Sequence, residues 1–154
     1  MRKTFVSFAV KKIKTFVKLC ENLVQLCEKN NMSKINQAIQ QRILVLDGAM
    51  GTMLQRNNFS EEDFRGERFK DFPHPLKGNN DLLSITQPEA VKQVHRLYFQ
   101  AGADIVETNT FSGTTIGMAD YHMEDLVYEL NYQSAKIARE VADEFTDKPR
   151  FVAG

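Results

Sequence analysis

Cysteine is scarce in this chain, and neither sign of charge is in excess. Only Cys20 and Cys27 occur among the 154 residues. Two cysteines do not make a disulfide framework, and this usage indicates a reducing compartment, so we expect a cytoplasmic protein. Lysine plus arginine and aspartate plus glutamate number 20 each, which gives a formal net charge of zero. A balanced chain has no electrostatic field to recruit nucleic acid, so we expect no nucleic-acid partner.

Long apolar runs without charge are missing too, so we expect no transmembrane segment. In residues 1–31, lysines interrupt apolar residues that recur at three- and four-residue steps, and the first acidic residue is Glu21. This pattern predicts an amphipathic basic helix. Organelle targeting or membrane-surface binding stays open for it. Our preferred hypothesis is that Met32 is the original start. The expected organisation is therefore an extension of residues 1–31 followed by a domain of residues 32–154.

Patterns typical of metal sites are absent. The chain has no CxxC and no HExxH, and His74, His95 and His122 are scattered. Cys20 and Cys27 lie seven residues apart, and one helix cannot bring such a pair into bonding range. The sequence therefore predicts no metal ligands in this chain. We assign no catalytic residue to it, and we expect His95 on the polar face of a helix.

Three short apolar runs predict strands of a parallel sheet. They are Ile43–Leu46, Asp104–Glu107 and Phe151–Gly154. The first run is unbroken, which is typical of a strand covered on both faces. Strands that alternate with helices imply right-handed parallel crossovers. Polar residues at their carboxyl ends suit the active face of an α/β barrel, and a small open α/β sheet is the alternative.

Two amphipathic helices are predicted between these strands. The first has Thr86 as its N-cap, Glu89 to complete a capping box, and Gly102 as its terminator. The second runs from about Glu124 to Phe145. The stretch of residues 48–85 has no long periodic segment, and a connection of this length in a compact domain is usually functional.

Polar residues at the ends of the first two strands form the candidate substrate site. Asp47 precedes Gly48 in a glycine-containing turn, which suits a zwitterionic amino acid. The carboxylate can hold an ammonium, and the backbone amides can hold a carboxylate. A turn in which Asp47 caps its own backbone is the alternative. Along residues 107–110 the side chains alternate, so two of them face the ligand space. Helix capping by Thr108 or Thr110 stays open.

Three segments resemble the homocysteine S-methyltransferase family. They are RILVLDGAMGTMLQ at residues 42–55, FRGERFKDFPHPLKGNNDLLSITQP at 64–88 and AGADIVETNTFSGTTIGMADY at 101–121. The resemblance covers roughly residues 36–154. Within it, LKGNNDLLSITQP is most similar to the amino-terminal homocysteine-binding module of cobalamin-dependent methionine synthases.

The resemblance implies an α/β fold that forms the first part of a (β/α)₈ TIM barrel, about three of its eight strands. It implies a domain that binds homocysteine and zinc. Asp47 and Gly48 match the family's turn that contacts homocysteine, and Asn109 and Thr110 match a second strand end near that ligand. These four are the candidate substrate-binding residues.

The implied reaction moves a methyl group from methylcobalamin, recharged from 5-methyltetrahydrofolate, to zinc-bound homocysteine, and gives methionine. The family's zinc ligands are cysteines on later strands, and separate modules bind folate and cobalamin. The implied partners are therefore homocysteine, the remaining barrel and those modules, and we expect this chain alone to be inactive. The alternatives are a noncatalytic half-barrel interaction protein and a cobalamin-independent methyltransferase that uses betaine or S-methylmethionine.

Overall fold

The computed structural model describes residues 34–154. The basic extension, its predicted helix and both cysteines lie outside the described residues. The chain divides into two compact units, Met1–Ile43 and Leu44–Gly154. In the first unit the described secondary structure is the helix α2 (Lys34–Gln41). The second unit carries the sheet, the core and the candidate site.

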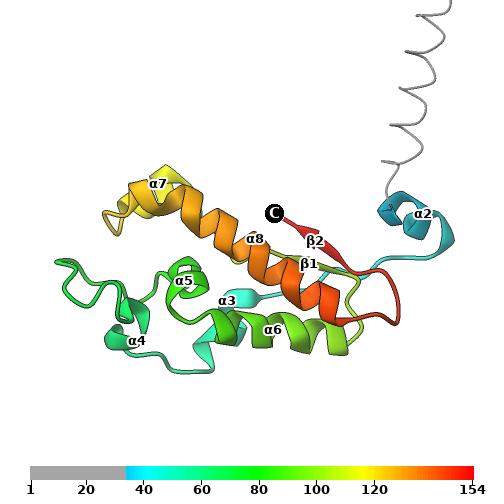
Figure 1. The fold of residues 1–154 in the computed structure, drawn as a ribbon, viewed down its shortest axis with the longest axis horizontal. Helices are drawn as coiled ribbons and strands as arrows, with labels where there is room; N and C mark the ends of the chain where they lie inside the picture. Colours follow the sequence, from blue (N-terminus) through cyan, green and yellow to red (C-terminus); the bar gives the residue numbers. More distant parts are fainter. Residues whose placement is uncertain (1–33) are drawn as a thin grey trace, which may run out of the picture. The chain divides into compact units, whose positions relative to one another are not determined.

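A short parallel sheet runs through the second unit (Figure 1). Strand β1 (Ile105–Glu107) pairs with β2 (Phe151–Ala153), with Ile105 opposite Phe151. At the other edge of β1, a parallel bridge joins Leu46 to Ile105. The fold is therefore mixed α/β with parallel pairing, and the strands predicted at 104–107 and 151–154 are confirmed.

The first predicted strand is reduced to that single bridge. Val45 and Leu46 are 54% and 48% exposed, and Ile43 is exposed too. Among the described residues this segment has β1 as its only sheet neighbour. The prediction of a strand covered on both faces is therefore wrong, because an apolar strand is buried only where other elements pack on both faces of the sheet.

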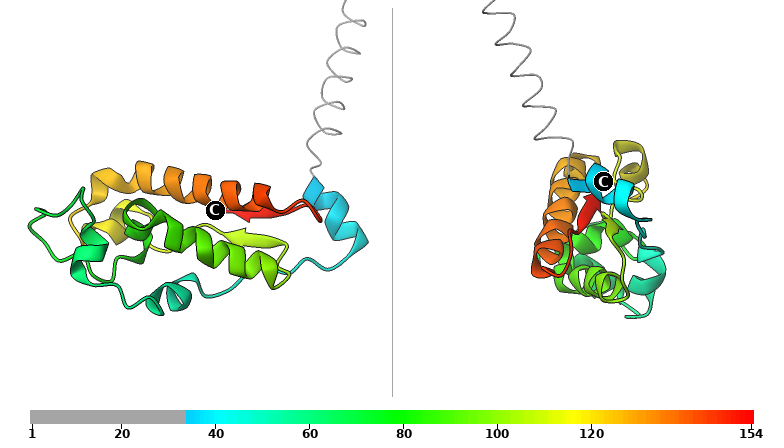
Figure 2. Two further views of the ribbon diagram at one scale, coloured as in Figure 1. Left: turned by 60° about the horizontal axis from the view of Figure 1, so that its bottom comes forward. Right: turned by 90° about the vertical axis from the view of Figure 1, so that its right-hand side faces the viewer.

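Two long helices pack side by side against the sheet (Figures 1 and 2). They are α6 (Pro88–Gln100) and α8 (Val127–Glu144). Gly102 ends α6 as predicted. Its φ of 106° is the left-handed conformation that glycine adopts without strain, and its amide donates to the Phe99 carbonyl at 3.0 Å.

The predicted capping box at the start of α6 does not form. Thr86 belongs to the preceding helix α5 (Leu83–Thr86), and its hydroxyl donates to the Leu82 carbonyl at 3.4 Å. Gln87 takes the N-cap position without a side-chain cap, and Pro88 opens the helix. Thr86 cannot cap α6 because its hydroxyl is bonded within its own helical turn.

Short helices fill the connections between the sheet and the long helices. They are α3 (Met50–Gln55), α4 (Glu61–Arg65), η1 (Asn80–Leu82), α7 (Thr115–Ala119) and η2 (Glu124–Leu126). With η2 and α8, the second predicted helix of residues 124–145 is confirmed. Among residues 34–154, no helix has both the length and the apolar character needed to cross a membrane.

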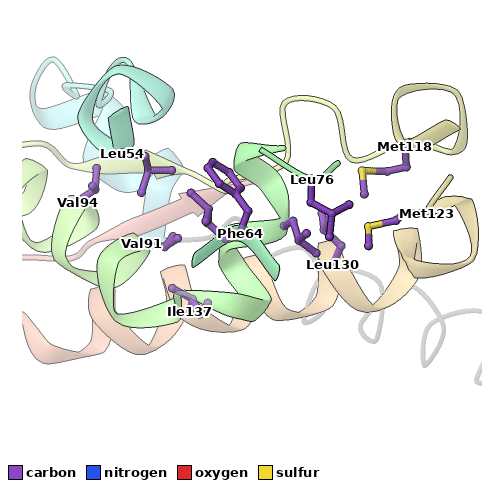
Figure 3. Close-up of a cluster of buried hydrophobic side chains, with 11 residues drawn as sticks. Leu54, Phe64, Leu76, Val91, Val94, Met118, Met123, Leu130 and Ile137 are labelled. Carbon is purple, nitrogen blue, oxygen red and sulfur yellow. The ribbon is translucent and has the colours of Figure 1, made fainter. Parts of the chain in front are cut away.

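Two core clusters occur among the described residues, one between β1 and the two long helices and one between the long helices and the short ones. Figure 3 shows the second of these. The buried side chains of this second cluster include Leu54 of α3, Val91 of α6 and Leu130 of α8. His95 is also buried, with an exposed fraction of 0%. It follows Val91 by four residues and so shares the buried line of α6. The expectation that His95 lies on a polar face is therefore wrong.

Candidate functional site

The carboxyl ends of the sheet segments open into a cleft of about 860 Å³. Three stretches supply most of its walls: Asp47–Thr52, Gly78–Asp81 and Glu107–Ser112. All four predicted substrate-binding residues line it. They are Asp47, Gly48, Asn109 and Thr110. The structure thus brings together two strand ends that lie about 60 residues apart in the sequence, as expected when parallel strands end at one edge.

Asp47 has one carboxylate oxygen in use and one without a partner. Its Oδ1 accepts a hydrogen bond from the Glu107 amide at 3.0 Å. Its Oδ2 is buried and has no hydrogen-bond partner among the described residues. Burial raises the pKa of Asp47 to about 6, opposed by the Glu107 amide and reinforced by the Glu107 carboxylate. A buried carboxylate oxygen without a donor is costly and favours a cationic ligand.

The turn after Asp47 leads directly into helix α3. Ala49 is the N-cap, and no side chain of the described residues caps the helix there. The first amides of a helix have no intrahelical partner. Gly51 allows a close approach to the opposite wall, because a Cβ atom at this position would lie 3.3 Å from Asn80 Nδ2. The turn therefore presents free amides at a narrow part of the cleft.

The second strand end does not keep the predicted alternation. Strand β1 ends at Glu107, and the Thr110 amide donates to the Thr108 carbonyl at 2.9 Å, so the chain turns there. The hydroxyl oxygens of Thr108 and Thr110 lie 2.7 Å apart and bond to each other. Helix capping falls instead to Thr114, whose hydroxyl accepts from the Gly117 amide at 3.1 Å.

The side-chain amide of Asn109 is bonded within the protein. Its Nδ2 donates to the Asn80 carbonyl at 2.8 Å and to Ser84 Oγ at 3.1 Å. Ser134 Oγ of α8 lies 2.8 Å from Ser84 Oγ and 3.2 Å from the Asn109 carbonyl oxygen. Asn109, Ser84 and Ser134 are all buried. The nitrogen of Asn109 is therefore committed to neighbouring elements.

Asp81 lines the cleft, although the sequence analysis did not single it out. Its Oδ2 accepts from the Ser112 amide at 2.6 Å. Burial raises its pKa, while hydrogen bonds from the Ser112 and Phe111 amides oppose this. Asp81 falls in a stretch without periodicity. Because Asn79 and Asn80 are turn formers, this stretch was interpreted as a turn. A carboxylate directly before the apolar pair Leu82 and Leu83 was the available signal.

No metal site is formed by the described part of the chain. Among residues 34–154 there is no group of three or more His, Cys, Asp or Glu side chains that could hold a metal ion. Two carboxylates that line the cleft, Asp47 and Asp81, accept hydrogen bonds from backbone amides.

Comparisons with known proteins agree with the fold and with the sequence motifs. Residues 44–154 match the family model described as homocysteine S-methyltransferase. Two solved structures of the homocysteine methyltransferase MmuM from Escherichia coli resemble the chain. The oxidized form is 24% identical with a TM-score of 0.56, over 73% of this chain and 36% of that one. The metallated form is 21% identical with a TM-score of 0.61, over 79% of this chain and 40% of that one. This chain thus spans two fifths or less of the length of these relatives.

Proposed function

Because this chain belongs to the homocysteine S-methyltransferase family, we propose that its cleft binds homocysteine. The observation that carries the proposal is the buried Oδ2 of Asp47, which has no partner among the described residues. The ammonium of an amino acid would supply the missing donor. Hydrogen bonds between two charged groups are stronger than neutral ones, so this contact would also fix the orientation of the ligand.

The rest of the cleft suits the other groups of homocysteine. The amides that begin α3, next to Gly48, can donate to the ligand carboxylate. The thiol would then extend into the remaining space. A cleft of about 860 Å³ is large for one amino acid.

The complete reaction that we propose follows the methionine synthase resemblance of residues 76–88. Residues 32–154 would form the first part of a (β/α)₈ barrel and hold the amino-acid end of homocysteine. The remaining barrel and the folate- and cobalamin-binding modules would be the partners, in the cytoplasm. Methylcobalamin would supply the methyl group, the product would be methionine, and this chain alone would be inactive.

Zinc is implied by the resemblance, but residues 34–154 do not fit it. They contain no suitable set of ligands, and the family's cysteine ligands belong to later strands. The role of the described residues is therefore confined to binding and orienting homocysteine. The family model names no methyl donor, so a cobalamin-independent homocysteine methyltransferase is the second candidate. Methionine formation by the complete protein without cobalamin would favour it.

Calorimetry with two ligands tests the proposed role of Asp47. Homocysteine should bind to the full 154-residue chain, and Asp47→Asn should weaken this binding by about ten- to a hundredfold, the value of a hydrogen bond to a charged group. The probe 4-mercaptobutyrate is homocysteine without its amino group. Its weaker binding should be the same in both proteins, because it offers Asp47 no ammonium.

A matched control is available in Asp104, a buried carboxylate that accepts from the Val45 amide at 3.0 Å and is not part of the cleft. Asp104→Asn should alter stability and leave homocysteine affinity unchanged. Equal homocysteine affinity in wild type and Asp47→Asn would reject Asp47 as the ammonium ligand. No binding of homocysteine to wild type would reject the proposed function of this chain.

A further inference from the structure

We propose that Asp81 and Asn109 are positioning residues. Their hydrogen bonds, which together we call the clasp, hold the loop after β1 (residues 108–112) against the segment around η1. This arrangement forms one wall of the cleft before the ligand binds. The inference rests on the proposed function, because it concerns the affinity for homocysteine. It assigns these two side chains to loop geometry and not to direct ligand contact.

The first half of the clasp is the bond from Asp81 to the loop backbone. The Asp81 carboxylate accepts from the Ser112 amide at 2.6 Å, and the Phe111 amide also bonds to it. The Phe111 side chain is 100% exposed. This part of the loop therefore has no apolar anchor at Phe111, and the carboxylate of Asp81 holds its backbone in place.

The second half is the buried network around Asn109. Its side-chain amide ties the loop to the Asn80 carbonyl and to Ser84 of α5. Ser134 of α8 bonds to Ser84 and reaches the Asn109 carbonyl. The loop is thereby fastened to three separate elements. A buried polar network whose members are satisfied is stiff, and it specifies one arrangement of the segments it joins.

The clasped loop continues directly from the residue that holds Asp47. The Glu107 amide donates to Asp47 Oδ1, and the next residues, Thr108 and Thr110, line the cleft. A loop that detached from η1 would remove this wall and loosen the support of Asp47. Ligand binding would then have to order the loop, and this cost would appear as lower affinity.

The size of the effect depends on the fraction of molecules whose loop is closed. The apparent Kd equals the intrinsic Kd divided by the fraction of molecules in the competent conformation. If Asp81→Ala leaves the loop closed in about one molecule in ten, the apparent Kd for homocysteine rises about tenfold. Asp81→Asn retains the shape and an acceptor oxygen, so it should give a smaller change in the same direction.

The test combines amide hydrogen exchange, measured by NMR, with the Kd for homocysteine, both on the full chain. In Asp81→Ala, exchange at Phe111 and Ser112 should become faster than in wild type, and the Kd should rise. The matched control is Asp104→Ala, because Asp104 is 1% exposed and Asp81 is 4% exposed. This control should leave the exchange of Phe111 and Ser112 and the Kd at their wild-type values.

The inference is overturned by wild-type exchange at Ser112 in Asp81→Ala, or by faster exchange with an unchanged Kd. It is also overturned if Asp104→Ala reproduces both effects, since both changes would then reflect general destabilisation. If Asp81→Ala does not fold, Asp81→Asn and Ser84→Ala are measured, with the same two readouts expected. If wild type does not bind homocysteine, the proposed function fails, and the exchange of Ser112 alone decides whether the clasp exists.

Discussion

The affinity for homocysteine should rise with pH as Asp47 ionises. Burial raises the pKa of Asp47 to about 6, although the Glu107 amide opposes the shift. Only the ionised carboxylate can pair with the ammonium of the ligand. With a pKa of about 6, about one molecule in eleven is ionised at pH 5 and about ten in eleven at pH 7. The Kd at pH 5 should therefore be about ten times the Kd at pH 7.

Calorimetric titrations at pH 5, 6 and 7 and constant ionic strength measure this dependence. The amino and carboxyl groups of free homocysteine keep their charges across this range. The Asp47→Asn variant retains every other titratable group of the protein, so it isolates the contribution of Asp47. Its Kd should be weak and nearly constant with pH. A constant Kd in wild type would refute the reasoning, and so would a variant that keeps the full tenfold change.

Two further predictions concern stability and the long connection before η1. His95 is fully buried without partners for its ring nitrogens among the described residues, and burial lowers its pKa to about 4. Because the folded pKa lies below the unfolded value, the protein should lose about 3 kcal/mol of unfolding free energy as pH falls from about 6.5 to 4. His95→Leu should remove that loss, as measured in urea titrations followed by circular dichroism. Arg65 donates to the carbonyls of Phe72 and His74, so Arg65→Ala should speed chymotrypsin cleavage in residues 66–77 several-fold. Arg68→Ala should not, because it removes an exposed ion pair with Glu129 and a contact with the Phe69 ring and leaves those backbone bonds intact. Equal acid sensitivity in His95→Leu, or equal cleavage of both arginine variants, would contradict these two assignments.

Periodicity and turn chemistry made much of the fold predictable. The second long helix, the strands at 104–107 and 151–154, and the Gly102 terminator depend on local spacing and on a conformation that glycine favours. The candidate residues Asp47 and Gly48 were likewise found at the edge of the cleft. Their place at a strand end predicted this position, because parallel strands bring their carboxyl ends together, and the family resemblance selected them as ligand contacts.

The errors arose where tertiary contacts decide the outcome. The burial of Ile43–Leu46 depends on the elements that pack around this segment, and the sequence of the segment does not specify them. His95 is polar, but it occupies the buried line of α6 set by Val91 and Phe99. The Thr86 hydroxyl could cap α6 or bond to the preceding turn, and it donates to the Leu82 carbonyl of that turn. Each outcome reflects a competition between local propensity and packing.

The direction of Asn109 could not be derived from strand alternation. The turn at residues 108–110 breaks that alternation, and the acceptors of the Asn109 amide come from η1 and α5. Asp81 was missed for a related reason, since its partner is a backbone amide 31 residues away. Long-range polar contacts of this kind leave no periodic signal in the sequence.

Chemical-shift mapping of the wild-type chain shows whether homocysteine binds in the cleft beside Asp47. Added homocysteine should shift the NMR amide signals of residues 47–52 and 107–112, which line the cleft, and 4-mercaptobutyrate should shift Asp47 much less. Absent shifts would show that homocysteine does not bind there. Shifts confined to the smaller groove beside Lys92 and Lys136 would also contradict binding in the cleft, because the ligand would then bind away from Asp47.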